Sequence, residues 1–159
     1  MSRQQKSQIV PEKIHLVSAN IFKANLDTAE RYLEAPEKLT RFNFGVANQI
    51  AYHLARNMAR YRLYFTLEAQ DQEGKPLGVK VEYGIEFHFE VENLNDFAKE
   101  QQDGTFQLDA TMGATLLGIA FSTARGIIFE RTRGTFFDGV ILPVVDPFKV
   151  LEEKYKRAT

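Results

Sequence analysis

The sequence predicts an α+β fold: a four-stranded antiparallel sheet with one long and one short C-terminal helix on one face. Apolar and polar residues alternate through much of residues 14–91, as in strands with one solvated face. An apolar segment at 108–133 then has helical spacing. A short segment that begins at Pro147 predicts the second helix. Strands followed by helices are typical of the α+β class.

Length and composition fit one domain. A chain of 159 residues can bury one core, and we expect a flexible tail at 1–10 and a single domain at 11–157. The formal charge of −1 argues against a dedicated nucleic-acid binder or a binder of anionic membranes. The sequence has no cysteine, which excludes disulfides, thiolate catalysis and cysteine metal sites.

The sequence shows no targeting or membrane signal. Residues 1–8 are polar and no apolar signal segment follows them. The most apolar stretch, 112–129, contains Arg125 and three glycines, so it predicts a buried helix rather than a membrane span. We therefore expect a cytoplasmic protein without membrane insertion.

The first predicted strand covers residues 14–22, where imperfect alternation indicates a β-bulge. Residues 23–39 are polar and irregular. Asp27 and Glu30 have the spacing that caps a helix, and they predict one short turn that ends before Pro36.

Three further strands follow. Alternation is clear at 41–46, while 47–59 is ambiguous and could continue the same strand. Residues 60–68 alternate again, a polar turn follows at 71–76, and 79–91 alternates over its whole length. Period 2 held this long predicts antiparallel strands with one polar face.

A polar connection at 93–107 leads to the long helix at 108–133. Its last turn carries Arg131 and Arg133 and is followed by Gly134, as is common at helix C-termini. Residues 136–147 read as an apolar loop. Asp146 then predicts the N-cap of the short last helix.

The long helix has two apolar stripes at helical spacing, although a helix on a sheet needs only one. The first contains Met112, Leu116, Ile119, Thr123 and Ile127. The second, which we predict as the oligomer interface, contains Leu117, Phe121, Ala124 and Ile128. The alternative is that the last helix and the loop at 136–145 cover the second stripe within one chain.

Residues 115–147 contain an early helix glycine, an Ala-Arg pair, a closing Arg-Gly-Thr-Phe and a following Leu-Pro-Val. These are Gly118, Ala124-Arg125, Arg133 to Phe136, and Leu142 to Val144. With these motifs the segment resembles the C-terminal half of the bacterial export chaperone SecB. The upstream strand pattern matches as pattern only, so the resemblance covers about residues 14–153.

The resemblance implies a homotetramer built as a dimer of dimers, with the long helices between the dimers. It also implies an ATP-independent chaperone that holds unfolded polypeptides in apolar grooves, where their exposed side chains leave water. The groove would lie between the second strand and the C-terminal loop and helix. The client-binding candidates are Phe42, Phe44, Phe136, Phe137, Val144, Phe148 and Leu151. The alternative for each is ordinary core packing.

The chain departs from SecB at the positions that dock on the motor SecA. The first-strand acidic positions correspond here to Ala19 and Lys23, and the tail EEKYKRAT is short and mixed in charge. Docking on SecA is therefore doubtful. Both protein export and an antitoxin client in a toxin–antitoxin system stay open as roles.

Catalytic and metal-binding constellations are not evident. Glu86, His88 and Glu90 share one strand face, but Arg60 and Arg62 on the neighbouring strand could pair with these glutamates. Neither a phosphate loop nor a nucleophile elbow occurs. We expect no enzyme activity, no metal and no cofactor. The alternative to a chaperone is an oligomeric α+β protein that binds a small apolar ligand.

Overall fold

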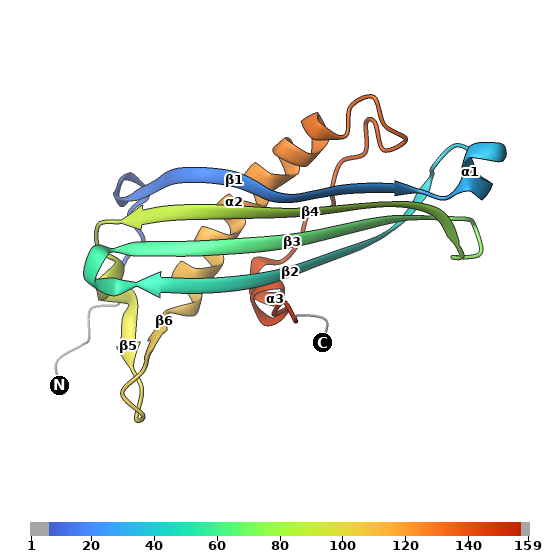
Figure 1. Ribbon diagram of the computed structural model, residues 1–159. Helices are drawn as coiled ribbons and strands as arrows, with labels where there is room; N and C mark the ends of the chain where they lie inside the picture. The colour runs from blue at the N-terminus through green and yellow to red at the C-terminus, as the bar shows by residue number, and fades with distance from the viewer. Residues whose placement is uncertain (1–6, 157–159) are drawn as a thin grey trace.

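The structure is a computed structural model that describes residues 7–156. Within this range four long strands form one antiparallel sheet in the order β1-β4-β3-β2, and helix α2 crosses one face of it (Figure 1). The strands are β1 (Ile14–Thr28), β2 (Arg41–His53), β3 (Met58–Gln70) and β4 (Pro76–Val91). The predicted fold class is confirmed.

The remaining elements are short except for α2. The helices are α1 (Glu30–Glu34), α2 (Ala110–Arg131) and α3 (Pro147–Glu152), with 3-10 turns at Pro11–Lys13, Leu54–Arg56 and Leu94–Phe97. Strands β5 (Ala98–Glu100) and β6 (Phe106–Leu108) form a small hairpin within the predicted polar connection. Of the predicted tail, residues 1–6 lie outside the described range, and Ile9 packs partly buried against the core.

Strand β1 is longer than predicted and bulged as predicted. Its register against β4 shifts between Leu16 and Ser18 and again between Ile21 and Lys23. It continues through the polar residues 23–28 because β4 offers backbone partners along its whole length. Asp27 is paired with Lys80 in this ladder and does not cap α1, so the predicted cap is wrong.

Strand β2 resolves the ambiguous stretch. It runs on to His53, and every residue from Arg41 to His53 has a partner on β3. Asn57, in the connection to β3, has φ of 55°, a left-handed conformation that asparagine tolerates better than most residues. The edge of β2 opposite β3 is an outer edge of the sheet.

The core lies between the inner face of the sheet and α2. Alternate residues of β3 and β4 are buried, which confirms the period-2 reading of both strands. The largest fully buried side chains include Tyr61, Leu63, Ile85, Phe87 and Phe89 from these strands and Met112, Leu116 and Leu117 from α2.

The second stripe of α2 is buried within the chain itself. Leu117, Phe121, Ala124 and Ile128 are at most 4% exposed. Phe121 packs on Phe44 of β2 and Phe65 of β3, with ring centroids 6.3 and 5.8 Å apart. Because the broad sheet covers this stripe, the prediction that these four residues form an oligomer interface is corrected. The exposed residues of α2 include Ser122, Gly126 and Phe129.

Helix α2 is long and apolar enough to cross a membrane by length and composition, but half of its apolar window is buried in the chain. Its position on the sheet agrees with the predicted core helix. The helix starts at the N-cap Asp109, whose carboxylate accepts from Thr111 N, and Gly134 beyond its end has φ of +78°. The Asp146 cap of α3 is confirmed, since its carboxylate accepts from Phe148 N at 3.0 Å.

Candidate functional site

A hollow of about 470 Å³ lies between β2 and α3, where the resemblance to SecB places the groove. Its lining residues are Phe44, Gly45, Val46, Val145, Asp146, Lys149, Val150 and Glu153. A second hollow separates α2 from α3 and includes Gly118 and Phe148. Helix α3 therefore has an open margin on each side, against the sheet edge and against α2.

The seven client-binding candidates divide by burial. Phe136, Val144 and Phe148 are 44%, 86% and 50% exposed. Phe42, Phe44 and Leu151 are half-buried and pack against the core. The six accessible residues do not form one cluster, because Phe136 leans on Tyr32 of α1, with ring centroids 4.9 Å apart. They are spread along the C-terminal loop, α3 and the neighbouring part of β2.

Phe137 is the exception among the candidates. Its side chain is fully buried, and its ring centroid lies 5.7 Å from that of Phe42. The neighbouring loop residue Leu142 is buried as well. Phe137 therefore anchors the loop to the sheet, and its assignment to the client surface is corrected to the core.

Asn48 is a residue of the candidate site that the sequence did not point to. It is fully buried in β2, and its side-chain Nδ2 donates to the carbonyl oxygens of Val150 and Glu153 at 2.6 and 3.2 Å. Its backbone N–H also donates to Glu153 O, at 2.8 Å. The signal in the sequence is weak: Asn48 is one amide within a series of apolar residues at even positions. The other members of this series are Phe42, Phe44, Val46 and Ile50.

A further hollow of about 470 Å³ lies between the end of β2 and the β5–β6 hairpin. Its lining is mainly apolar: Ile50, Ala51, Tyr52, Leu54, Ala98, Phe106 and Leu108. Phe106 is 58% exposed on the hairpin. The sequence reasoning missed this surface because Phe106 is a single aromatic residue within a polar connection. The two hollows along β2 lie on either side of Asn48.

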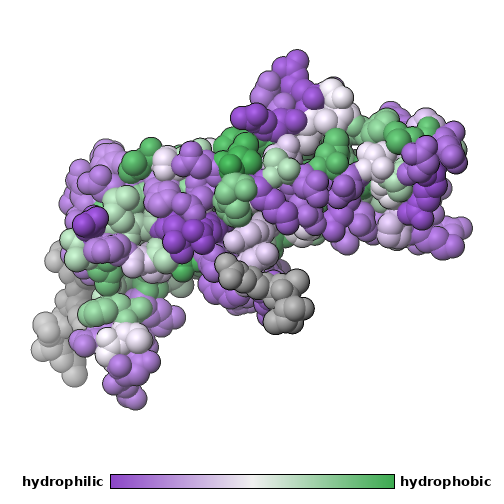
Figure 2. Space-filling model, in the orientation of Figure 1, coloured by the Kyte–Doolittle hydropathy of each residue, from purple (hydrophilic) through white to green (hydrophobic). Residues whose placement is uncertain are grey.

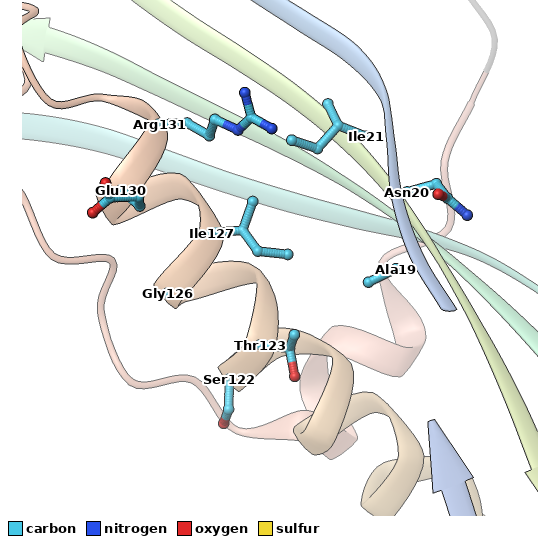
Figure 3. Close-up of a pocket in the computed structure, with 9 residues that line it drawn as sticks. All are labelled: Ala19, Asn20, Ile21, Ser122, Thr123, Gly126, Ile127, Glu130 and Arg131. Atoms are coloured by element: carbon cyan, nitrogen blue, oxygen red, sulfur yellow. The ribbon is translucent and has the colours of Figure 1, made fainter. Parts of the chain in front are cut away.

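Another hollow, of about 800 Å³, lies between β1 and α2 (Figure 3). Thr123 and Ile127 of α2 point toward β1, whereas Ser122 lies on the side away from it. Arg131 lies beside Ile21 at one end. This hollow borders the exposed side of α2 and the outer strand of the sheet.

Strand β1 is an edge strand with an apolar exposed surface. Figure 2 shows hydrophobic residues among hydrophilic ones along the border that β1 forms. The exposed large hydrophobic residues of β1 are Leu16, Val17, Phe22 and Leu26. Edge strands of this kind pair readily with other chains, so this border is also available for contacts.

Two glutamates of the charged strip on the outer face, Glu82 and Glu86, are paired with cations within the sheet. Glu86 binds Arg62 and His88, and the hydrogen bond from Arg62 is the main cause of the lowered pKa of the Glu86 carboxyl. Glu82 contacts Lys80 and Lys23 at 2.9 and 3.1 Å, and the pKa of this carboxyl is lowered as well, mainly by the bond from Lys80. The predicted pairing of Arg62 with the strip is confirmed.

Residues 7–156 contain no group of three or more acidic or histidine side chains placed to hold a metal. Tyr61 of β3 is a fully buried titratable residue. Burial raises the pKa of its hydroxyl well above the ordinary value, and this hydroxyl hydrogen-bonds with Tyr52 and donates to Gly113 O of α2. These hydrogen bonds join β2, β3 and α2, so we assign Tyr61 a structural role.

The arrangement of the sheet and helices can be compared with solved structures. The SecB-like chaperone Rv1957 of Mycobacterium tuberculosis, solved with a ChAD peptide from the antitoxin HigA1, matches with a TM-score of 0.57. The match covers 84% of this chain and 91% of that one at 10% sequence identity. The chain has a SecB-like fold. The resemblance inferred from residues 115–147 is confirmed as a likeness of fold.

A protein of unknown function from Streptococcus agalactiae also matches, at 12% identity over 82% of this chain and 97% of that one. Its TM-score of 0.36 is too low to establish a shared fold. No protein-family model matches the sequence, and no curated protein matches it.

Proposed function

We propose that this SecB-like chain is an ATP-independent molecular chaperone that binds unfolded or non-native polypeptides. The observation that supports this proposal most directly is the surface along β2, where apolar side chains flank an edge of the sheet. Its exposed or half-buried members are Phe44, Tyr52, Phe106, Val144, Phe148 and Leu151. The solved neighbour with an antitoxin peptide supports the same role.

The physical basis of binding is apolar burial combined with backbone pairing. An unfolded client exposes apolar side chains, whose transfer out of water is favourable without a defined sequence. Within the described chain, the outer edge of β2 is bridged only at Asn48, by Lys154. Its other outward backbone groups can accept an extended segment as an added strand.

We propose an antitoxin-like client rather than a SecA-dependent export client. The neighbour contains an antitoxin peptide, which supports the first. The outer face of the sheet argues against a SecA-dependent export client. Lys23 occupies one of the first-strand positions that are acidic in SecB, and it pairs with Glu82. Because Glu82 and Glu86 are paired with cations, the strip offers fewer free carboxylates on which a motor could dock.

We further propose a homotetramer in the cytoplasm, built through the exposed side of α2 and the β1 edge. Phe129 is 40% exposed on α2, and β1 carries four exposed hydrophobic residues. Surfaces of this type favour contacts with a second copy. The small-ligand alternative needs an enclosed pocket, whereas the four hollows described above are open to solvent.

Aggregation assays test the proposal. Three unrelated, chemically unfolded proteins are diluted into buffer without ATP, with and without the chain, and light scattering is followed. We expect suppression at near-stoichiometric ratios for all three. A Val144→Ser, Phe148→Ser double variant should suppress less, whereas Phe129→Ser should keep client binding. Equal aggregation with and without the wild-type chain would refute the chaperone function.

A further inference from the structure

An aromatic row crosses the outer face of the sheet. Phe22 of β1 meets Tyr64 of β3 edge to face, with ring centroids 5.4 Å apart. Tyr155, beyond α3, stacks on Tyr64 with centroids 3.6 Å apart and planes 7° from parallel. Gly84 of β4 makes room for Phe22, since a Cβ there would lie 2.5 Å from its ring. The row thus holds a C-terminal residue on the face opposite α2.

The residues before Tyr155 bind the edge of β2 as a very short parallel strand. The Asn48 N–H donates to Glu153 O at 2.8 Å, and the Tyr155 N–H donates to Asn48 O at 2.8 Å. The Lys154 ammonium donates to Asn48 Oδ1 at 3.2 Å, on the inner side. Successive side chains of an extended segment point to opposite faces, which explains why Tyr155 reaches the outer face.

We infer that residues 153–155 are an internal stand-in for client polypeptide. An extended client segment displaces them, pairs with β2 at Asn48 and stacks an aromatic side chain on Tyr64. This inference rests on the proposed chaperone function and names a recognition element for it. The residue before the aromatic one faces Asn48 Oδ1, so a side chain that donates a hydrogen bond fits there. The ligand class is therefore an extended peptide with a cationic–aromatic pair such as Lys-Tyr.

The geometry makes displacement feasible. The stand-in is held at one residue of β2, by two backbone bonds, two hydrogen bonds of the Asn48 side chain and one stacked ring, and Glu153 and Lys154 are exposed. A longer client can use the same contacts and continue along β2 on both sides of Asn48. There it would meet the hollow that contains Phe44 and the one that contains Tyr52. More backbone bonds and more apolar burial then favour the client over the short internal segment.

The test uses a fluorescently labelled peptide with the sequence EEKYKRA and the full-length chain, followed by anisotropy. Tyr155→Ala removes the competing ring, so we expect this variant to bind the peptide about tenfold more tightly than the wild type does, which corresponds to about 1.4 kcal/mol. A peptide with alanine in place of its tyrosine should lose that gain. Adding Tyr64→Ala to Tyr155→Ala should abolish the tighter binding of the peptide. Adding Tyr64→Phe instead, which keeps the ring, should retain the tighter binding. Phe129→Ala, an exposed aromatic on α2, is the matched control and should leave binding unchanged.

Two results would overturn the inference: equal binding to wild type and Tyr155→Ala, or equal affinity for the tyrosine and alanine peptides. Neither depends on the folding of a Tyr64 variant. Aggregation suppression by the wild type is measured in parallel. If suppression is present while the tyrosine and alanine peptides bind equally, the chaperone function stands and only the aromatic recognition element fails.

Discussion

The side-chain amide of Asn48 donates a 2.6 Å hydrogen bond to the backbone carbonyl of Val150, 102 residues away in the sequence. Both residues are buried, and the bond fixes α3 to the edge of β2. The same amide also donates to Glu153 O at 3.2 Å, so Asn48 sets the position of α3 along the strand. The hollow between β2 and α3 depends on this contact.

Asn48→Ala should destabilise the chain by about 1–3 kcal/mol, because it removes two side-chain hydrogen bonds between β2 and α3, each worth about 0.5–1.5 kcal/mol. Chemical denaturation followed by circular dichroism measures this loss. Asn43→Ala, at an exposed position of the same strand, is the control and should change stability by less than about 0.5 kcal/mol. Equal stability of the two variants would contradict the role assigned to Asn48.

The neighbouring residues Phe136 and Phe137 should respond differently to substitution by alanine. Phe137→Ala opens a cavity in the core and should cost about 3–5 kcal/mol of unfolding free energy. Phe136→Ala removes a side chain that is 44% exposed, so the cost should be clearly smaller and client binding should weaken instead. Urea unfolding and aggregation suppression, measured on both variants, separate the two effects. The reverse order of stabilities would show that the burial assignment is wrong.

The ion pair between Glu86 and Arg62 makes stability depend on pH. The pKa of the Glu86 carboxyl lies below its ordinary value of 4.5, mainly through the bond from Arg62 and further through His88. A lowered folded-state pKa stabilises the fold above the unfolded value and loses this contribution as pH falls through the folded value. The stability difference between wild type and Glu86→Gln should therefore be largest above pH 4.5 and shrink below it. Unfolding curves between about pH 3 and about pH 7 measure this, and a constant difference would contradict the linkage.

Two substitutions on α2 should separate folding from assembly. Leu117→Asp buries a charge beneath the helix and should unfold the chain. Gly126 lies on the exposed side, and an added Cβ there meets nothing within 4 Å in residues 7–156. Gly126→Glu should therefore keep the fold and lower the mass of the proposed tetramer, measured by light scattering with circular dichroism as the folding control. An unchanged oligomer mass would exclude this side of α2 from the interface.

Local patterns predicted most of the fold. Period-2 alternation located β3 and β4, because each of their residues needs only to face the core or water. The N-cap at Asp146 and the stop at Gly134 were also readable, since capping depends on a few adjacent residues. The full length of β1 was not readable, because its polar end is strand only through pairing with β4.

By itself, the sequence determined the order of strands and helices, the double apolar character of α2 and the SecB-like C-terminal segment. Only the tertiary structure decided what covers each surface. The apolar side chains of Leu117 and Phe121 fit both an oligomer interface and a core within one chain. Their burial within one chain depends on the width of the sheet beneath them. The contacts of Asn48 with Val150 and of Tyr64 with Tyr155 join segments about a hundred residues apart, so no local pattern specifies them.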